Sequence, residues 1–511
     1  MFKMILISLF FSHAIFAAPV SNPGNVLIII VDDLGTNELQ CYGSRLDGDY
    51  PFTPYIDALR TNGILFRNVY AAPSCSPTRA GVQTGRYGFR TGMGTATLNY
   101  NLPMEETIIP EVLDRNSSLG YRHAAIGKWH ISSLNQDPFI APNVYGYNYF
   151  SGTQGNLGDY CNWTKIQNGV HSQCTNYATT ENIDDALTWI SQQNQEKWFM
   201  WLALNAPHSP YHVPPSISSN CSVLFEGELI DRYQLMIERI DMEIGRLITI
   251  MDPMVLADTT IIFMGDNGTP QEVTVAPFVP TKGKGTIYEG GIKVPMIISG
   301  NKVVNAGREV THLVNSVDIF ATALELMGVN LFMSLPCVPM DSISLTPIVT
   351  NSGIGNARSY MFSEKFINRD PEHADYCIRD YFYKYLKFNT GVEELYNVLN
   401  DPYESINLFD IMTFEEQLEL NKLRDIAVNL RSSDIWCNQH CCGENCWSCC
   451  NDSHCQAGWK CSSERHTCMN VECLTDGDCV GGKAGRYFTY IQIGTCMGNN
   501  TCCYGICAEG N

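Results

Sequence analysis

Continuous apolar runs recur along the first three fifths of the chain, and the first of them is rich in β-branched residues. They lack the alternation of polar and apolar positions that marks a half-exposed strand, so they predict strands buried on both faces of a sheet. The runs are Asn25–Val31, His123–Ile126, Trp198–Leu204, Thr260–Met264 and Val294–Ile298.

Segments with the helical spacing of apolar residues separate these runs. They are Pro54–Asn62, Ile108–Asn116, Ile183–Asn194, Asp231–Met251 and Ser316–Leu326, the last with Asn315 as its N-cap. Strands that alternate with helices predict an α/β fold, with a large, mostly parallel mixed sheet sandwiched by helices. We expect this domain to cover residues 18–330.

The pattern changes from about Leu331. A short strand at Tyr381–Phe388 and a helix at Phe414–Leu430 predict a smaller C-terminal α+β subdomain over residues 331–436. From Cys437 the chain is rich in Cys and Gly and poor in aliphatic residues. We therefore expect residues 437–511 to form a tail held by disulfides rather than by an apolar core.

The N-terminus has the pattern of a cleaved signal peptide. One lysine precedes a short apolar run that ends in small residues, which predicts a signal over residues 1–17 with cleavage after Ala17. A membrane anchor is the alternative. Since no other stretch is long and apolar enough to cross a bilayer, we expect no membrane span in the mature chain. This places the protein in the secretory pathway, either extracellular or lysosomal.

Composition supports that compartment and excludes one class of partner. The chain has 22 cysteines, most of them in the tail, which indicates an oxidising environment. Its formal net charge of −20 argues against nucleic-acid binding, which requires a basic face. Possible N-glycosylation sequons begin at Asn116, Asn162, Asn220, Asn451 and Asn499.

The cysteines ahead of the tail allow a pairing hypothesis. We expect Cys41 to be a buried free thiol, Cys161 to pair with Cys174, and Cys437 to bridge the tail to the body. An intermolecular disulfide is the alternative for the last bridge. The oligomeric state is not predicted.

The most distinctive motif runs from Cys75 to Arg86. Ser76 can cap a helix, Pro77 suits its first turn, and Gly85 suits its end, so Cys75 lies just before a helix N-terminus. Backbone N–H groups there favour an anion, and Arg79 adds a fixed positive charge. A disulfide cysteine in a loop is the ordinary alternative for such a residue in a cysteine-rich chain.

Acidic and amide side chains follow two of the predicted strands. Asp32 and Asp33 come directly after the first run, and Asp266 and Asn267 follow Thr260–Met264. The carboxyl ends of parallel strands are where α/β sheets place ligand sites. Oxygen donors without His suit a hard cation, Ca²⁺ before Mg²⁺. A single Asp-Asp pair would more often be a turn, but the second pair favours a metal site.

Basic residues complete the candidate site. Lys128 and His130 are two positions apart, so in an extended segment they point to the same side. His208 and Lys284 add two further basic groups. We interpret the other histidines considered, His123, His171, His212 and His312, as structural or surface residues.

Together these motifs resemble the formylglycine-dependent, arylsulfatase-like sulfatases of the alkaline phosphatase superfamily. The motif that most clearly supports this resemblance is Cys75-Ser-Pro-Thr-Arg79, followed by Thr84-Gly85-Arg86. The resemblance extends from Asn25 to about Asp410, and the stretches Tyr87–Gly94 and Leu102–Glu105 look closest to the galactosamine-sulfatase type. Further matching motifs are Asp32–Gly35, Gly127–His130, Asn205–Pro210, Gly265–Gly268, Lys282–Pro295 and Glu394–Pro402.

The resemblance implies a mechanism and a set of roles. Cys75 is oxidised to formylglycine by the formylglycine-generating enzyme during secretion, and its hydrate attacks sulfur to give a covalent intermediate. His208 or Lys284 protonates the leaving alcohol, and His130 removes a proton so that sulfate is expelled. The implied catalytic residues are Cys75, Arg79, Lys128, His130, His208 and Lys284. The implied ligands of Ca²⁺, or less readily Mg²⁺, are Asp32, Asp33, Cys75, Asp266 and Asn267.

The resulting hypothesis is a sulfuric ester hydrolase that acts on aryl or carbohydrate sulfate monoesters. The substrate is a sulfated small molecule or saccharide, and loops over about 132–180 and 211–223 are expected to select it. Two alternatives remain. One is a phosphomonoester or phosphonate hydrolase of the same superfamily, because fold alone does not determine function. The other is a non-catalytic protein that binds sulfated glycans.

Overall fold

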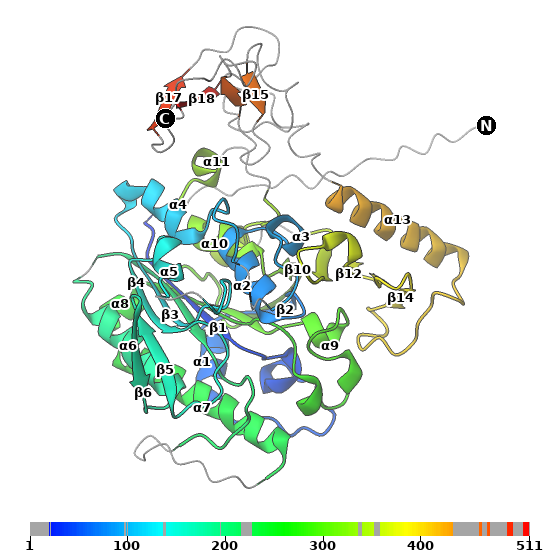
Figure 1. Ribbon diagram of the computed structural model, residues 1–511. Helices are drawn as coiled ribbons and strands as arrows, with labels where there is room; N and C mark the ends of the chain where they lie inside the picture. Colours follow the sequence, from blue (N-terminus) through cyan, green and yellow to red (C-terminus); the bar gives the residue numbers. More distant parts are fainter. Residues whose placement is uncertain are drawn as a thin grey trace. The chain divides into compact units, whose positions relative to one another are not determined.

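The computed structural model describes most of the chain ahead of the cysteine-rich tail (Figure 1). The described residues are 20, 22–96, 99, 101–135, 139–194, 196–215, 227–335, 340–351 and 358–432, with short strands at 459–461, 468–470, 488–493 and 504–509. Two compact units are present, one formed by residues 1–330 with 341–425 and the other by 331–340 with 426–511.

A ten-stranded sheet forms the centre of the first unit, in the order β10-β2-β9-β8-β1-β7-β3-β4-β5-β6. β1 lies between β8 and β7 and is parallel to both, and β3 is parallel to β7 and β4. In chain order the strands are β1 Asn25–Val31, β2 Gly63–Tyr70, β3 Arg122–Lys128, β4 Tyr149–Thr153, β5 Trp163–Gln167, β6 Val170–Cys174, β7 Trp198–Leu204, β8 Thr259–Gly265, β9 Met296–Gly300 and β10 Arg308–Asn315.

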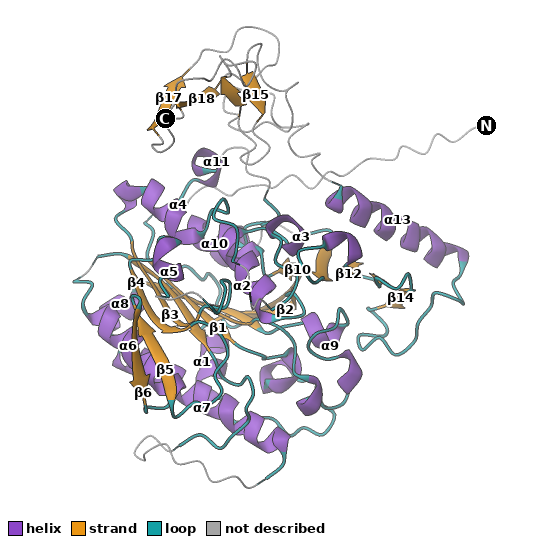
Figure 2. Cartoon of the chain, viewed as in Figure 1, coloured by secondary structure: helices purple, strands orange, loops and turns teal. Residues whose placement is uncertain are grey.

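Helices cover both faces of this sheet (Figure 2). α1, α6 and α7 pack together on one face, and α2, α4 and α10 pack on the other. The helices are α1 Pro54–Thr61, α2 Cys75–Thr84, α3 Gly88–Thr91, α4 Ile109–Arg115, α5 Ala141–Val144, α6 Ala178–Ser191, α7 Leu229–Ile250, α8 Pro253–Ala257, α9 Glu289–Ile292, α10 Asp318–Leu326, α11 Leu331–Ser334, α12 Thr346–Thr350 and α13 Phe414–Arg431.

Burial explains why the central strands read as continuous apolar runs. All seven residues of β1 are buried, and so are all seven of β7 and of β8. On one face Leu27 and Ile29 join the cluster that α1, α6 and α7 complete. Because helices cover both faces, neither face of a central strand is free to carry polar side chains.

The predicted fold class, a large, mostly parallel mixed sheet sandwiched by helices, is confirmed. The run at Val294–Ile298 corresponds to β9, which pairs antiparallel with both β8 and β2. An apolar run does not encode strand direction, because both arrangements bury the same side chains. The sheet is also wider than predicted, since β2, β10 and the β4–β6 edge carry weaker apolar patterns.

A second, four-stranded sheet follows in the order β11-β12-β13-β14, and every pair in it is antiparallel. Its strands are β11 Met361–Lys365, β12 Asp375–Arg379, β13 Tyr383–Lys387 and β14 Glu393–Asn397. The strand predicted at Tyr381–Phe388 and the helix predicted at Phe414–Leu430 are present as β13 and α13. In the tail, β15 Trp459–Cys461, β16 Cys468–Asn470, β17 Phe488–Ile493 and β18 Tyr504–Glu509 form another sheet.

The bonding states of the cysteines ahead of the tail differ in part from the predicted pairing. Cys161 is disulfide-bonded, but Cys174 carries a free thiol, so the predicted Cys161–Cys174 bridge is wrong. Cys174, the last residue of β6, pairs with Trp163 of β5 rather than with Cys161. Cys41 is free as predicted, although half-buried rather than buried. Cys437 and residues 1–17 lie outside the described residues. Among the helices in the described ranges, none has the length and apolar character of a membrane span.

A carboxylate from α7 caps the N-terminus of α1. Asp241 accepts hydrogen bonds from the backbone N–H groups of Tyr55 and Ile56, at 3.0 and 2.7 Å. Thr53, at the N-cap position, makes no side-chain cap. The contact therefore joins two helices that cover the same face, and burial raises the pKa of Asp241 to about 6.

We expect this group to make the stability of the fold depend on pH. Its pKa in the folded chain lies above the ordinary value, so its contribution is fully present below about pH 4 and is lost as pH rises through about 6. Asp241→Asn keeps an acceptor oxygen and removes the titration. Urea unfolding of both proteins should show the wild type losing stability relative to Asp241→Asn between these pH values. A constant difference would contradict the assignment. Asp241→Ala should cost about 1–2 kcal/mol through the lost cap.

Candidate active site

The predicted site residues meet at one edge of the large sheet. β1, β7, β8 and β3 are neighbours, and they run parallel, so their carboxyl ends lie together. Asp32 follows β1, Asp266 follows β8, and Lys128 is the last residue of β3. Asn205, which follows β7, opens the loop that carries His208.

Four oxygen-bearing residues form the acidic part of the site. The backbone N–H of Asp33 donates to Asp266 Oδ1 at 3.1 Å, and Asn267 Nδ2 donates to Asp33 Oδ1 at 2.9 Å. Asp32 and Asp266 are fully buried. Asp33 has a left-handed backbone with φ of 65°, which turns the chain sharply after β1. Asp and Asn are among the residue types that tolerate this region.

This group of side chains fits a divalent cation. Single ligand atoms of Asp32, Cys75 and Asp266 all lie within 4.8 Å of one another. The Oδ1 atoms of Asp32 and Asn267 are buried and accept no hydrogen bond from the described residues. Buried oxygen atoms without a donor are costly unless a cation faces them. The donors are oxygen apart from one sulfur, which suits Ca²⁺ or Mg²⁺ better than zinc.

Cys75, the first residue of α2, is part of this group. It is 2% exposed, and its Sγ is 3.1 Å from Nδ1 of His130. The predicted cap is wrong by two residues: Ser74 occupies the N-cap position, whereas the Ser76 hydroxyl donates to the carbonyl of His130 at 2.6 Å. Gly85 ends α2 in a left-handed conformation, as predicted.

Arg79 connects the acidic residues to β3 from a fully buried position. Its Nε donates to Asp266 Oδ2 at 2.9 Å, and its Nη1 donates to the carbonyl of Lys128 at 2.7 Å. Its Nη2 is 3.9 Å from Asp32 Oδ1. The guanidinium thus holds a positive charge between two strand ends without reaching solvent.

His130 is a neutral, buried imidazole beside Cys75. Burial, and then the charges of Lys128 and Arg79, hold its pKa well below the usual value. Its backbone is left-handed with φ of 57°, and non-glycine residues in this conformation often occur at functional sites. A neutral ring can accept a proton from a group at position 75.

Two lysines and a second histidine face the carboxylates. Lys128 Nζ donates to Asp32, and Lys284 Nζ donates to Asp33. Asp33 raises the pKa of Lys284 above its usual value, although burial opposes this. His208 Nδ1 contacts the carbonyl of Ser209 at 2.8 Å, which leaves Nε2 facing Asp33 Oδ2 at 3.8 Å. Because a carbonyl only accepts, Nδ1 carries the hydrogen and Nε2 faces the site.

Two tyrosines that the sequence did not single out hold the loops of the site. Tyr160 donates its hydroxyl hydrogen bond to the carbonyls of Asn205 and His208, at 2.8 and 2.7 Å. Tyr233, on α7, donates to the carbonyl of Asp33 at 2.6 Å. These contacts could not be predicted from local sequence patterns, because they join segments far apart along the chain.

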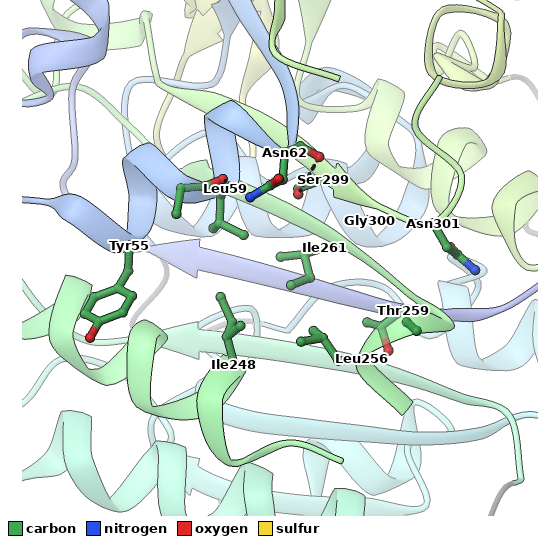
Figure 3. Close-up of a pocket in the computed structure, with 12 residues that line it drawn as sticks. Tyr55, Leu59, Asn62, Ile248, Leu256, Thr259, Ile261, Ser299, Gly300 and Asn301 are labelled. Carbon is green, nitrogen blue, oxygen red and sulfur yellow. Dashed lines mark hydrogen bonds between the residues drawn. The ribbon is translucent and has the colours of Figure 1, made fainter. Parts of the chain in front are cut away.

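A cavity of about 450 Å³ lies elsewhere, between α1, α7, α8 and the strands β8 and β9 (Figure 3). Its aliphatic lining residues include Leu59, Ile248 and Ile261. It lies beside Thr259, the first residue of β8, whereas Asp266 follows the last residue of that strand. None of the candidate site residues described in this subsection lines it, so this cavity is separate from the candidate active site.

Fold and site together define an α/β protein that gathers carboxylates and cationic side chains around a cysteine at a helix N-terminus. The Sulfatase family model matches residues 24–329. The model for N-sulphoglucosamine sulphohydrolase, C-terminal, matches residues 282–429. The chain belongs to the sulfatase family.

Named relatives agree with this family. Human N-acetylgalactosamine-6-sulfatase is 28% identical over 351 residues, which cover 61% of this chain and 64% of that protein. The chain thus spans just under two thirds of that relative's length. Human arylsulfatase A is 26% identical over 485 residues, which cover 81% of this chain and 91% of that protein.

Solved structures share the fold. The crystal structure of Ps i-CgsB has a TM-score of 0.67 at 24% identity, and the match covers 80% of this chain and 93% of that chain. The structure of BT4656 in complex with its substrate D-glucosamine-2-N,6-O-disulfate has a TM-score of 0.64 at 20% identity. That match covers 81% of this chain and 99% of the other.

Proposed function

We propose that this chain hydrolyses sulfate monoesters, of aryl alcohols or carbohydrates, and releases the alcohol and inorganic sulfate. The observation that carries the proposal is the surroundings of Cys75. Its sulfur is 3.1 Å from His130 Nδ1 and shares a cluster with the carboxylates of Asp32 and Asp266. The relatives named N-acetylgalactosamine-6-sulfatase and arylsulfatase A support the same class of substrate.

The proposal includes two groups that the chain acquires. Cys75 is converted to formylglycine by the formylglycine-generating enzyme in the secretory pathway, and Asp32, Asp33, Asp266 and Asn267 hold Ca²⁺, with residue 75 as a further ligand. When present, these groups supply a hydroxyl nucleophile and a fixed positive charge beside it. The protein would act outside the cell or in lysosomes, in agreement with its N-terminal pattern and cysteine content.

The remaining steps belong to side chains of the chain itself. Arg79 and Lys128 hold positive charge beside residue 75, and Lys128 and Lys284 offset charge on the sulfate oxygens. His208 Nε2 faces the site and, when both ring nitrogens carry a hydrogen, donates a proton to the leaving alcohol. His130, neutral and next to residue 75, accepts a proton from that residue.

Paired substrates test the class of reaction. We expect the chain, produced in a host that makes formylglycine, to cleave an aryl sulfate much faster than the matching aryl phosphate. Mass spectrometry of the peptide around Cys75 should show formylglycine. Faster phosphate release would assign the chain to phosphoester chemistry. An unmodified Cys75 with no hydrolysis would instead favour a sulfated-glycan-binding protein. A panel of sulfated saccharides, steroids and lipids would then identify the natural ester.

The metal is tested by elemental analysis. We expect about one Ca²⁺, or Mg²⁺, per chain, because the donors are hard oxygen atoms. Asp266→Ala should remove the ion, since it deletes a buried carboxylate of the cluster. Asp252→Asn is the matched control, because this residue caps α8 away from the cluster and should leave the metal content unchanged. Stoichiometric zinc in the wild type would contradict the assignment.

A further inference from the structure

Glu404 is a buried acidic residue in the loop between β14 and α13, two residues after the motif that ends at Pro402. It is 1% exposed, and its backbone is left-handed with φ of 56°. A long side chain in this conformation is uncommon and persists only where the surroundings enforce it. Its contacts show what enforces it.

Both ends of the loop that carries Lys284 are attached to this one residue. At the start of the loop, Lys282 Nζ donates to the backbone carbonyl of Glu404. At its end, the backbone N–H of Glu289 donates to the Glu404 carboxylate at 2.6 Å. Lys282 also lies over the rings of Tyr288 and Tyr396, 4.4 and 5.0 Å from their centroids. Glu404 therefore closes the eight-residue segment Lys282–Glu289 into a fixed loop.

Charges from the small sheet balance this clamp. Lys384 on β13 is fully buried, 2.7 Å from the Glu404 carboxylate and 3.2 Å from that of Glu289. Arg379 on β12 also faces Glu289, at 3.4 Å. The Tyr70 hydroxyl donates a hydrogen bond to the Glu289 carboxylate at 3.0 Å. Buried carboxyl groups require such partners, and Lys384 on the small sheet faces both Glu404 and Glu289.

Between its attached ends, the loop reaches the active site. The Lys284 N–H donates to the carbonyl of Thr269 at 2.9 Å, and the Gly285 N–H donates to the carbonyl of Pro73 at 2.8 Å. Lys284 Nζ then donates to Asp33. A shift of either end of the loop would move this ammonium group relative to residue 75. α9, which begins at Glu289, and β14 lie on the same side of the molecule (Figure 1).

We propose that Glu404 is a positioning residue that sets the place of the Lys284 ammonium group in the active site. Glu404 touches neither Asp33 nor Cys75, and it acts through the loop. The inference rests on the proposed sulfatase function for its kinetic test, but the clamp itself can be tested without activity.

The kinetic test is a double-mutant cycle of Glu404→Ala and Lys284→Ala. With Lys284 present, we expect Glu404→Ala to lower kcat/KM for an aryl sulfate by about 100-fold, the scale of a displacement of about 1 Å in a catalytic group. In the Lys284→Ala background, the same change should lower it less than about threefold, because the group being positioned is gone. Rates are divided by the formylglycine content of each preparation. Equal losses in both backgrounds would overturn the proposal.

Controls separate positioning from folding. Glu393→Ala removes a carboxylate on β14 of the small sheet. This carboxylate pairs with Arg424 and does not contact the Lys282–Glu289 loop, so the kcat/KM of the variant should match that of the wild type. Glu404→Gln keeps the side-chain length and an acceptor oxygen. It replaces Glu404→Ala in the cycle if the alanine variant does not fold, with a smaller expected loss and the same non-additivity.

Hydrogen exchange tests the clamp directly. Amides of residues 283–289 should exchange faster in Glu404→Ala, which removes the acceptor for the Glu289 N–H, than in the wild type, and those of β1 should not change. Unchanged exchange in the loop would overturn the proposal whatever the kinetics. If the wild type releases no sulfate from any ester, the proposed function fails. Faster exchange of residues 283–289 would still support the clamp in that case.

Discussion

Cys75→Ala should lower sulfate release by at least about a thousandfold, because it deletes the atom from which the nucleophile is made. The side chain is buried at the start of α2, and alanine is compatible with that helical position. We therefore expect the fold to survive, with a thermal unfolding midpoint close to that of the wild type. Initial rates on a chromogenic aryl sulfate, measured at high enzyme concentration, set the limit of detection.

The matched control for this substitution is another free cysteine. Cys41 carries a free thiol in a turn beyond β1, and Cys41→Ala should retain activity and formylglycine content. Retention of more than about one per cent of the wild-type rate by Cys75→Ala would remove this residue from the nucleophile role. A folded Cys75→Ala protein that still binds the metal would show that Asp32, Asp33, Asp266 and Asn267 are sufficient ligands.

His208→Ala should produce the second large effect, and its size should depend on the leaving group. For esters of poorly acidic alcohols we expect a loss of about 100- to 10,000-fold, because these need a proton from the enzyme. Esters of acidic phenols should lose far less. A plot of log kcat/KM against the pKa of the leaving alcohol should therefore be steeper for the variant than for the wild type.

His212→Ala is the control for a histidine in the same loop. His212 contacts the Tyr177 hydroxyl at 3.1 Å and the carbonyl of Pro210 at 2.8 Å, and it packs on the ring of Tyr160. Its replacement can lower stability but should leave the leaving-group dependence unchanged. Equal losses across all leaving groups for His208→Ala would assign the proton donor elsewhere, with Lys284 as the next candidate.

Much of the fold could be predicted because its signals are local. β1 and β7 have the bounds that their apolar runs predict, and α1 differs by one residue. Gly85 ends α2 because a left-handed residue is needed there and glycine adopts it without strain. The weaker strands β2 and β10 were missed, since part of each is exposed or half-exposed and interrupts the apolar pattern.

The candidate site was predictable for a different reason. Asp32, Asp266 and Lys128 stand directly at strand ends, and the ends of parallel strands must meet at one edge of a sheet. The contacts that hold the loops of the site could not be predicted from the sequence. Tyr160, Tyr233 and Glu404 form hydrogen bonds with residues far from them along the chain, and such bonds require no regular spacing of residues.

The sequence by itself determined which chemical groups the candidate site contains: a cysteine and an arginine at the start of a predicted helix, four oxygen-bearing residues after two strands, and the basic residues Lys128, His130, His208 and Lys284. These features can be read from the sequence because they depend only on residue type and on the spacing of nearby residues. Tertiary structure decided which atoms meet. It made β9 antiparallel, left Cys174 free while Cys161 is bonded, turned Ser76 toward His130, and attached the Lys284 loop to Glu404. These outcomes follow from packing and from the pairing of buried polar groups, which only the folded chain brings within reach.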